Sequence, residues 1–72
     1  MDKTATEIIT EAEANMFMNL NVGPEPFGVS RVQRTLRIGY GRADTIIRHL
    51  RAQNRIEPLP DTPWHYRKVV DA

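Results

Sequence analysis

Apolar residues recur at helical spacing in three segments of the chain and alternate with polar residues near its end. In residues 4–20 the apolar positions form one stripe, made of Ala5, Ile8, Ile9, Ala12, Met16 and Leu20. Thr4 is followed three residues later by Glu7, the spacing of a capping box at a helix start. The pattern predicts an amphipathic helix over about residues 4–20, with this stripe facing the core.

Two shorter helices are predicted in the middle of the chain. Val29, Val32 and Leu36 indicate a helix over about 30–37, with Ser30 as its cap. A second stripe, formed by Ala43, Ile46, Ile47 and Leu50, indicates a helix over about 42–53. Gly39 is expected to end the first helix with a positive φ, and Gly41 to cap the second. A linker of this length is typical of a helix-turn-helix.

The remaining segments predict loops and a hairpin. Residues 21–26 are rich in Gly and Pro and indicate a loop, after which residues 27–29 are expected to form a short strand. Asn54 suits a left-handed helix end. Residues 55–57, a proline-rich turn and residues 64–70 predict a β-hairpin over about 55–70, with Trp64 packed in the core or the wing. Residues 1–72 are thus expected to form a single domain, a mainly α, α+β winged helix-turn-helix.

Charge is distributed unevenly along the chain. Residues 1–28 carry a net −4, residues 29–57 carry +5 with seven arginines, and residues 58–72 are neutral. The basic segment coincides with the two short helices, and arginine binds phosphates and guanines bidentately. The alternative is a solvated arginine-rich surface that pairs with the acidic first helix.

The helix predicted over 42–53 has the outer face that a DNA-reading helix needs. At about 100° per residue, the face opposite its apolar stripe carries Gly41, Thr45, Arg48 and Ala52. Arg42 and His49 lie on one flank, and Asp44 and Arg51 lie on the other. Small and basic side chains of this kind allow a helix to enter the major groove.

The segment RVQRTLRIGYGRADTIIRHLRAQNRIEP resembles the gamma domain of the FtsK family of DNA translocases. The specific core of the likeness is Gln33-Arg34 and Ile38-Gly39-Tyr40, and further matches are Ser30, Arg42, Ala43, Ile47, Leu50, Ile56 and Pro58. Residues 7–12 are similar to the acidic first helix of that family, and residues 66–70 to its last strand. The resemblance implies a winged helix that reads a short, oriented, G-rich duplex sequence and steers a translocase.

The chain departs from the family pattern at Thr35, Gly41, Asp44 and Thr45, and Asn54 replaces a glycine. The first four positions lie on or beside the reading face. The resemblance therefore implies a DNA-binding fold without carrying the family's DNA site over to this chain.

Signals for other chemistry are absent from the sequence. The chain has no cysteine, and its two histidines stand apart without a metal-binding spacing. We find no nucleophile elbow, no phosphate loop and no apolar run long enough to span a membrane. We therefore expect no enzyme activity, no cofactor, no metal and no membrane contact, and a cytoplasmic protein associated with the nucleoid.

The sequence leads to two hypotheses of different classes. The first is a module that binds double-stranded DNA, either a small regulator, plausibly of a phage or plasmid, or a part of a larger translocase. Its expected DNA-binding residues are Arg34, Arg37, Gly41, Arg42, Thr45, Arg48, His49, Arg67 and Lys68, with Arg42 and Arg48 on bases and Arg34 on phosphate. The second is a winged helix used for protein–protein binding. A homodimer or protein contact is expected through Met16, Phe17 and Met18, with Trp64 as a further anchor.

Overall fold

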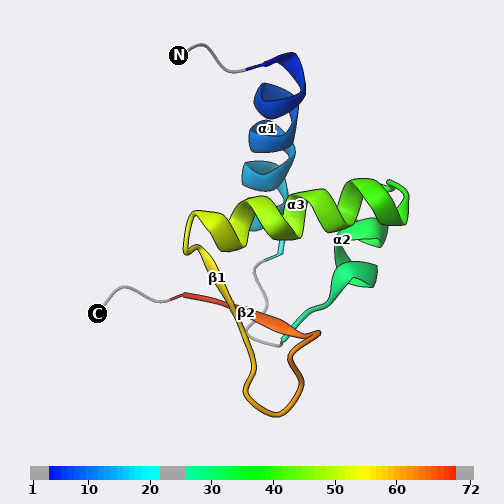
Figure 1. Ribbon diagram of the computed structural model, residues 1–72. Coiled ribbons are helices and arrows are strands. Elements are labelled where there is room, and N and C mark those ends of the chain that lie inside the picture. Colours follow the sequence, from blue (N-terminus) through cyan, green and yellow to red (C-terminus); the bar gives the residue numbers. More distant parts are fainter. Residues whose placement is uncertain (1–3, 22–25, 70–72) are drawn as a thin grey trace.

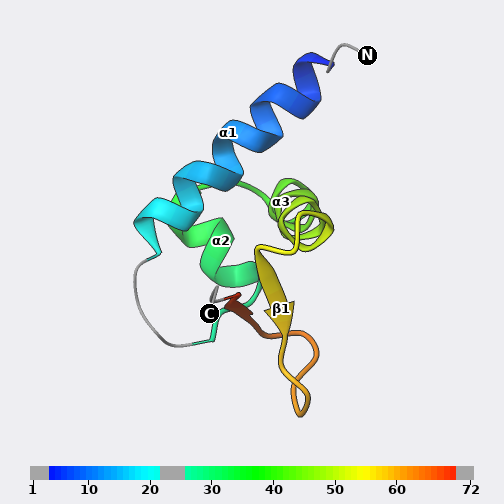
Figure 2. The same cartoon turned by 90° about the vertical axis from the view of Figure 1, so that its left-hand side faces the viewer.

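Three helices and a small hairpin follow one another along the chain (Figure 1). The structure is a computed structural model and describes residues 4–21 and 26–69. The elements are α1 (Ala5–Leu20), α2 (Val29–Leu36), α3 (Tyr40–Ala52), β1 (Ile56–Pro58) and β2 (Tyr66–Lys68). Figures 1 and 2 show α3 crossing α1, with α2 below α1 and the hairpin at the far end from the start of α1. This is the α+β, mainly helical, winged-helix-like layout that the sequence predicts.

Helix α1 begins where the sequence predicts, but it turns a different face to the core. Thr4 caps the helix, and its Oγ1 accepts a hydrogen bond of 3.2 Å from the backbone N–H of Glu7. The buried residues are Thr10, Ala14 and Phe17. The predicted stripe is wrong, because every one of its members is exposed.

The aromatic side chain of Phe17 explains why the face of α1 opposite the predicted stripe is buried. Phe17 is fully buried, and its ring meets that of Phe27 edge to face, with the centroids 5.1 Å apart. An aromatic side chain buries more surface than an isoleucine and gains from this ring geometry. Ala14 and Thr10 are small and lie on the same side of α1, which allows α3 to approach closely.

The turn between α2 and α3 forms earlier than the glycines suggest. Arg37 is the residue in the left-handed region, with φ of 55°, and its N–H donates to the carbonyl of Gln33. Gly39 has φ of −75° and is the N-cap of α3, so the expected positive φ at Gly39 and cap at Gly41 are both wrong. Ser30 lies inside α2, whose N-cap is Gly28. The early reversal lets Ile38 pack against the core.

Helix α3 buries the predicted stripe of Ala43, Ile46, Ile47 and Leu50, which confirms that part of the pattern. Asn54 follows the helix with φ of 57°, as expected for a left-handed helix end. The stripe joins Phe17, Phe27, Val32 and Ile56 in one core cluster.

The hairpin pairs β1 with β2 in antiparallel register, with Glu57 opposite Arg67. The strand expected at 27–29 is reduced to one bridge, in which Phe27 and Tyr66 exchange backbone hydrogen bonds of 2.9 and 2.7 Å. Val70, at the end of the predicted wing, lies outside the described residues, as do residues 22–25 of the predicted loop. A two-stranded hairpin is marginal alone, so this bridge and the packing of Tyr66 on the core hold the wing in place.

None of the helices described is both long and apolar enough to span a bilayer.

The two faces of α1 predict opposite effects for neighbouring substitutions. Phe17→Ala should lower the free energy of unfolding by about 3–5 kcal/mol, because it empties a fully buried site. Met16→Ala should change it by less than ~0.5 kcal/mol in dilute protein, because Met16 is exposed. Urea denaturation followed by circular dichroism measures both. A larger loss for Met16→Ala would show that the isoleucine side of α1 is the buried one.

Candidate nucleic-acid interface

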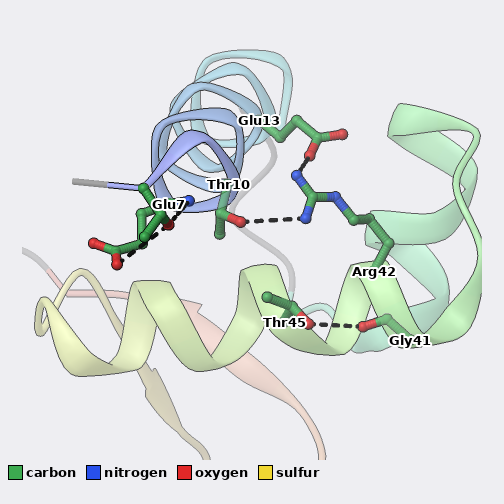
Figure 3. A network of polar contacts seen from close by, with 7 residues as sticks. Glu7, Thr10, Glu13, Gly41, Arg42 and Thr45 are labelled. Atoms are coloured by element: carbon green, nitrogen blue, oxygen red, sulfur yellow. Dashed lines mark hydrogen bonds and ion pairs between the residues drawn. The ribbon is translucent and has the colours of Figure 1, made fainter.

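The outer face of α3 is open and lined by small residues. Gly41, Thr45, Arg48 and Ala52 are all exposed, as the sequence predicts. The hydroxyl of Thr45 donates to the carbonyl of Gly41 at 3.0 Å, so it is satisfied within its own helix. In Figure 3 Arg42 reaches toward α1, whereas Gly41 and Thr45 do not. A partner can therefore approach this face without displacing any part of the described chain.

Arg48 is the cation at the centre of this face. Its side chain is 80% exposed, and its Nε donates to Oδ2 of Asp44 at 2.9 Å. An exposed pair at i, i+4 contributes only about 0.3–0.5 kcal/mol, so a phosphate or a guanine can replace Asp44 as the partner. Asp44 nevertheless lowers the local positive charge.

Arg42 does not project outward as expected. Its guanidinium turns to α1, where Nη1 donates to Oγ1 of Thr10 at 3.3 Å and Nη2 pairs with Glu13 (Figure 3). Both partners of the ion pair are largely covered, with 29% and 24% of their side chains exposed. Arg42 therefore ties the start of α3 to α1, and we correct its expected role as a base contact.

His49, on the same flank of α3, is also partly buried. Its Nε2 atom is buried and has no hydrogen-bond partner. The structure thus places the Arg42 and His49 flank against the molecule rather than on the open face.

Arg34 and Arg37 are the most available cations in the described part of the chain. Both are exposed, and neither side chain makes a hydrogen bond or ion pair within residues 4–21 and 26–69. Arg34 lies in the last turn of α2, and Arg37 lies in the turn that leads into α3. Both therefore lie in the part of the chain that leads into α3 and carry positive charge that is available to a ligand.

The two cations expected on the wing are engaged by the protein. Arg67 is exposed and pairs with Glu57 on the opposite strand, with 2.6 Å between Nε and Oε1. Lys68 donates from Nζ to the carbonyl of Met18 at 3.0 Å and joins the wing to the end of α1. Trp64 was expected to pack in the core or the wing, and its exposure of 64% excludes the core.

Two residues near the open face were not among the expected DNA-binding residues. Tyr40 is 64% exposed and is the first residue of α3, because the helix begins two residues before the predicted start. Arg51 is exposed on the wing side, where its guanidinium lies 5.9 Å from the ring centroid of Tyr66. The sequence carried no signal for the contact between Arg51 and Tyr66, because it depends on where Tyr66 lies relative to α3 in the folded chain.

Within the described ranges, no group of three His, Cys, Asp or Glu side chains is arranged to hold a metal ion.

Comparisons of the chain with models of known families, with curated proteins and with solved structures found no match. A functional assignment therefore rests on the residues and geometry of the chain itself.

The different settings of Arg42 and Arg48 predict different effects on stability. Arg42→Gln should lower the free energy of unfolding by about 1 kcal/mol or more, because it leaves the partly buried Glu13 without its cation. Arg48→Gln removes the same charge from the same helix and should cost less than ~0.5 kcal/mol. Thermal denaturation of both variants at low salt tests this, and equal losses would contradict the structural role of Arg42.

The left-handed backbone at Arg37 predicts a stabilising substitution. Arg37→Gly should raise the free energy of unfolding by roughly 0.5–1 kcal/mol, because glycine adopts a positive φ without steric cost. Arg37→Ala keeps the strain and serves as the control. If glycine were no more stable than alanine in urea denaturation, the turn would not have the backbone described.

Proposed function

We propose that this chain is a double-stranded DNA-binding module that reads its site with the outer face of α3. The observation that carries the proposal is the open face of small residues around Arg48, preceded by the exposed and unpartnered side chains of Arg34 and Arg37 in α2 and the turn. A B-DNA major groove is about 12 Å wide and admits a helix whose outward side chains are small. No large apolar side chain stands among Gly41, Thr45, Arg48 and Ala52 to prevent entry.

The contacts divide into two kinds under this proposal. Arg48 approaches base edges from the middle of α3, where a bidentate contact to guanine contributes about 1–3 kcal/mol of discrimination. Arg34 and Arg37 contact phosphates and fix the position of α3 on the duplex. Arg67 adds a wing contact when it leaves Glu57, whereas Arg42, His49 and Lys68 support the fold.

The small number of free cations sets the expected strength. Each neutralised phosphate contributes about −0.9 to the slope of log K against log salt concentration. Three or four contacts give a slope of roughly −3, which is modest for a specific DNA-binding protein. A single copy should therefore bind weakly at physiological salt, and useful affinity requires a second site or a second copy.

The likeness to the FtsK gamma domain supports the same proposal. Its specific core, Gln33-Arg34 and Ile38-Gly39-Tyr40, falls on the end of α2 and on the turn into α3. The proposal covers both a small nucleoid-associated regulator in the cytoplasm and the DNA-reading part of a larger translocase.

A protein-binding role is a second candidate, favoured by the exposed apolar residues of α1. Its expected anchor changes, because Phe17 is fully buried and Met18 packs against the core. Met16 and Trp64 remain exposed. A module of this kind would give no salt-dependent shift of a duplex in a gel, which separates the two roles.

Single substitutions test the assigned contacts. Arg48→Ala should weaken binding to a duplex selected from a random pool more than binding to random duplex. Arg34→Ala should weaken both alike and reduce the salt slope by about one unit. Fluorescence anisotropy at several salt concentrations measures both effects.

The matched control is Arg31→Gln. Arg31 lies on α2 like Arg34, but its Nη1 donates to Oδ1 of Asn21 at the end of α1. This variant removes the same charge and should leave the slope unchanged, provided that it folds with a native circular dichroism spectrum. Equal losses for Arg31→Gln and Arg34→Ala would mean that net charge alone, rather than this face, governs binding.

A further inference from the structure

Helix α1 carries a continuous apolar stripe on its outer side. We use "α1 stripe" for the exposed residues Ala5, Ile8, Ile9, Ala12, Met16 and Leu20. Four of them are large, and more than half of each side chain is exposed: Ile8 55%, Ile9 53%, Met16 53% and Leu20 57%. A contiguous apolar surface of this kind on a small domain marks an interaction site.

The rest of the described chain lies on the other side of α1. At about 100° per residue, the centre of the stripe is roughly 150° around the helix from Thr10, Ala14 and Phe17. Figure 2 shows α2, α3 and β1 together on one side of α1. The stripe therefore faces outward along the whole length of the helix.

We propose that the α1 stripe binds the same stripe of a second copy of this chain, and that the resulting dimer holds two DNA segments. The charges around the stripe favour an identical partner. One edge carries the uncharged Asn15 and Asn19, and the other carries Thr6 and Glu13, whose carboxylate is paired with Arg42. Two copies can approach without setting like charges against each other.

The position of the acidic residues disfavours other occupants. Glu7 and Glu11 lie on the side of α1 turned more than ~100° from the stripe centre, so they would not meet a partner seated on it. A helix that lies on a lipid surface carries Lys and Arg beside its apolar face. The described part of α1 carries neither.

The sizes of the side chains suit an antiparallel pair. When Ala12 of one copy lies opposite Met16 of the other, Ile8 lies opposite Leu20 at both ends. The small Ala12 then accommodates the long Met16 side chain at the centre, and the larger Ile8 and Leu20 pack together at the two ends. The spacing from Ile9 to Ala12 to Met16, three and then four residues, is that of a helix–helix seam.

The size of the stripe fixes the kind of dimer. Four half-exposed large side chains on each copy bury roughly 800 Å² in total, about half of a standard interface of ~1,600 Å². The dimer is therefore reversible and depends on protein concentration. A weak dimer is consistent with the small number of DNA contacts proposed for each copy.

The orientation of α3 determines what the dimer does, a step that rests on the proposed DNA binding. The open face of α3 lies opposite its buried stripe, and neither Gly41 nor Thr45 reaches toward α1 in Figure 3. Pairing through the outer side of α1 thus places the two open α3 faces on opposite sides of the dimer. Such a dimer bridges two duplex segments instead of reading two half-sites on one.

Sedimentation of the chain without DNA tests the dimer by itself. The native chain should change from monomer to dimer between about 1 and 500 µM. Met16→Glu should raise the dissociation constant at least ~10-fold, since it buries an unpaired charge in the seam. Gln53→Glu adds the same charge at an exposed position at the end of α3, outside the α1 stripe, and should dimerise like the native chain.

Two outcomes overturn the dimer. One is a native chain that stays monomeric at 500 µM. The other is a dimer that Met16→Glu does not weaken while its circular dichroism spectrum stays native.

Capture of a fluorescent duplex by a second, immobilised duplex tests the bridge. The native chain should retain the fluorescent duplex, whereas Met16→Glu should bind duplex in anisotropy and fail to bridge. A dimer that binds duplex and does not bridge overturns the proposed orientation. If the chain forms the dimer but binds no duplex, pairing through the α1 stripe is supported and the proposed DNA binding is rejected.

Discussion

The burial of Phe17 is the constraint on which the rest of the structure depends. Once its ring is packed against Phe27, the orientation of α1 about its own axis is fixed. Thr10 and Glu13 then meet Arg42 at the start of α3. The isoleucines of α1 are turned outward by the same choice. One aromatic contact thus determines both how α3 is anchored and which apolar surface the protein displays.

The arginines of the middle segment divide into those that hold the fold and those that remain available. Arg31, Arg42 and Arg55 each donate to a side chain of α1 or its cap, namely Asn21, Glu13 with Thr10, and Asn15. One of these partners, Glu13, is an acid of the first helix, so the pairing that the alternative interpretation of the charge pattern proposed is present in the Arg42–Glu13 contact. Arg34, Arg37, Arg48 and the exposed Arg51 are the arginines left for a ligand around α3, and they lie on one continuous stretch from α2 into that helix. The charge counted along the sequence is therefore larger than the charge available to a ligand.

Much of the fold could be predicted from local patterns, and the errors have physical causes. The three helices, the hairpin, the Thr4 cap, the α3 stripe and the left-handed Asn54 follow from spacing and residue type. The face of α1 could not be predicted in this way, because two apolar faces compete and the choice depends on Phe27, which is distant in sequence. The turn was misplaced because Arg37 adopts a backbone that glycine prefers. In the candidate site, the exposure of Gly41, Thr45, Arg48 and Ala52 was predicted correctly. The burial of Arg42 was not predicted, because it depends on which face of α1 packs against α3.

The first turn and a half of α1 is held differently from the rest of the helix. Residues 5–9 are all exposed, and a capping hydrogen bond and the helical backbone are what support them within the described structure. A helical end with so little packing opens on its own with a small free energy, independently of global unfolding. Any association that uses Ile8 and Ile9 must first select the closed, helical form of this segment. The affinity of such an association will therefore fall as temperature rises, well before the core itself melts. The temperature range in which the chains associate is then set by the stability of the first turns of α1.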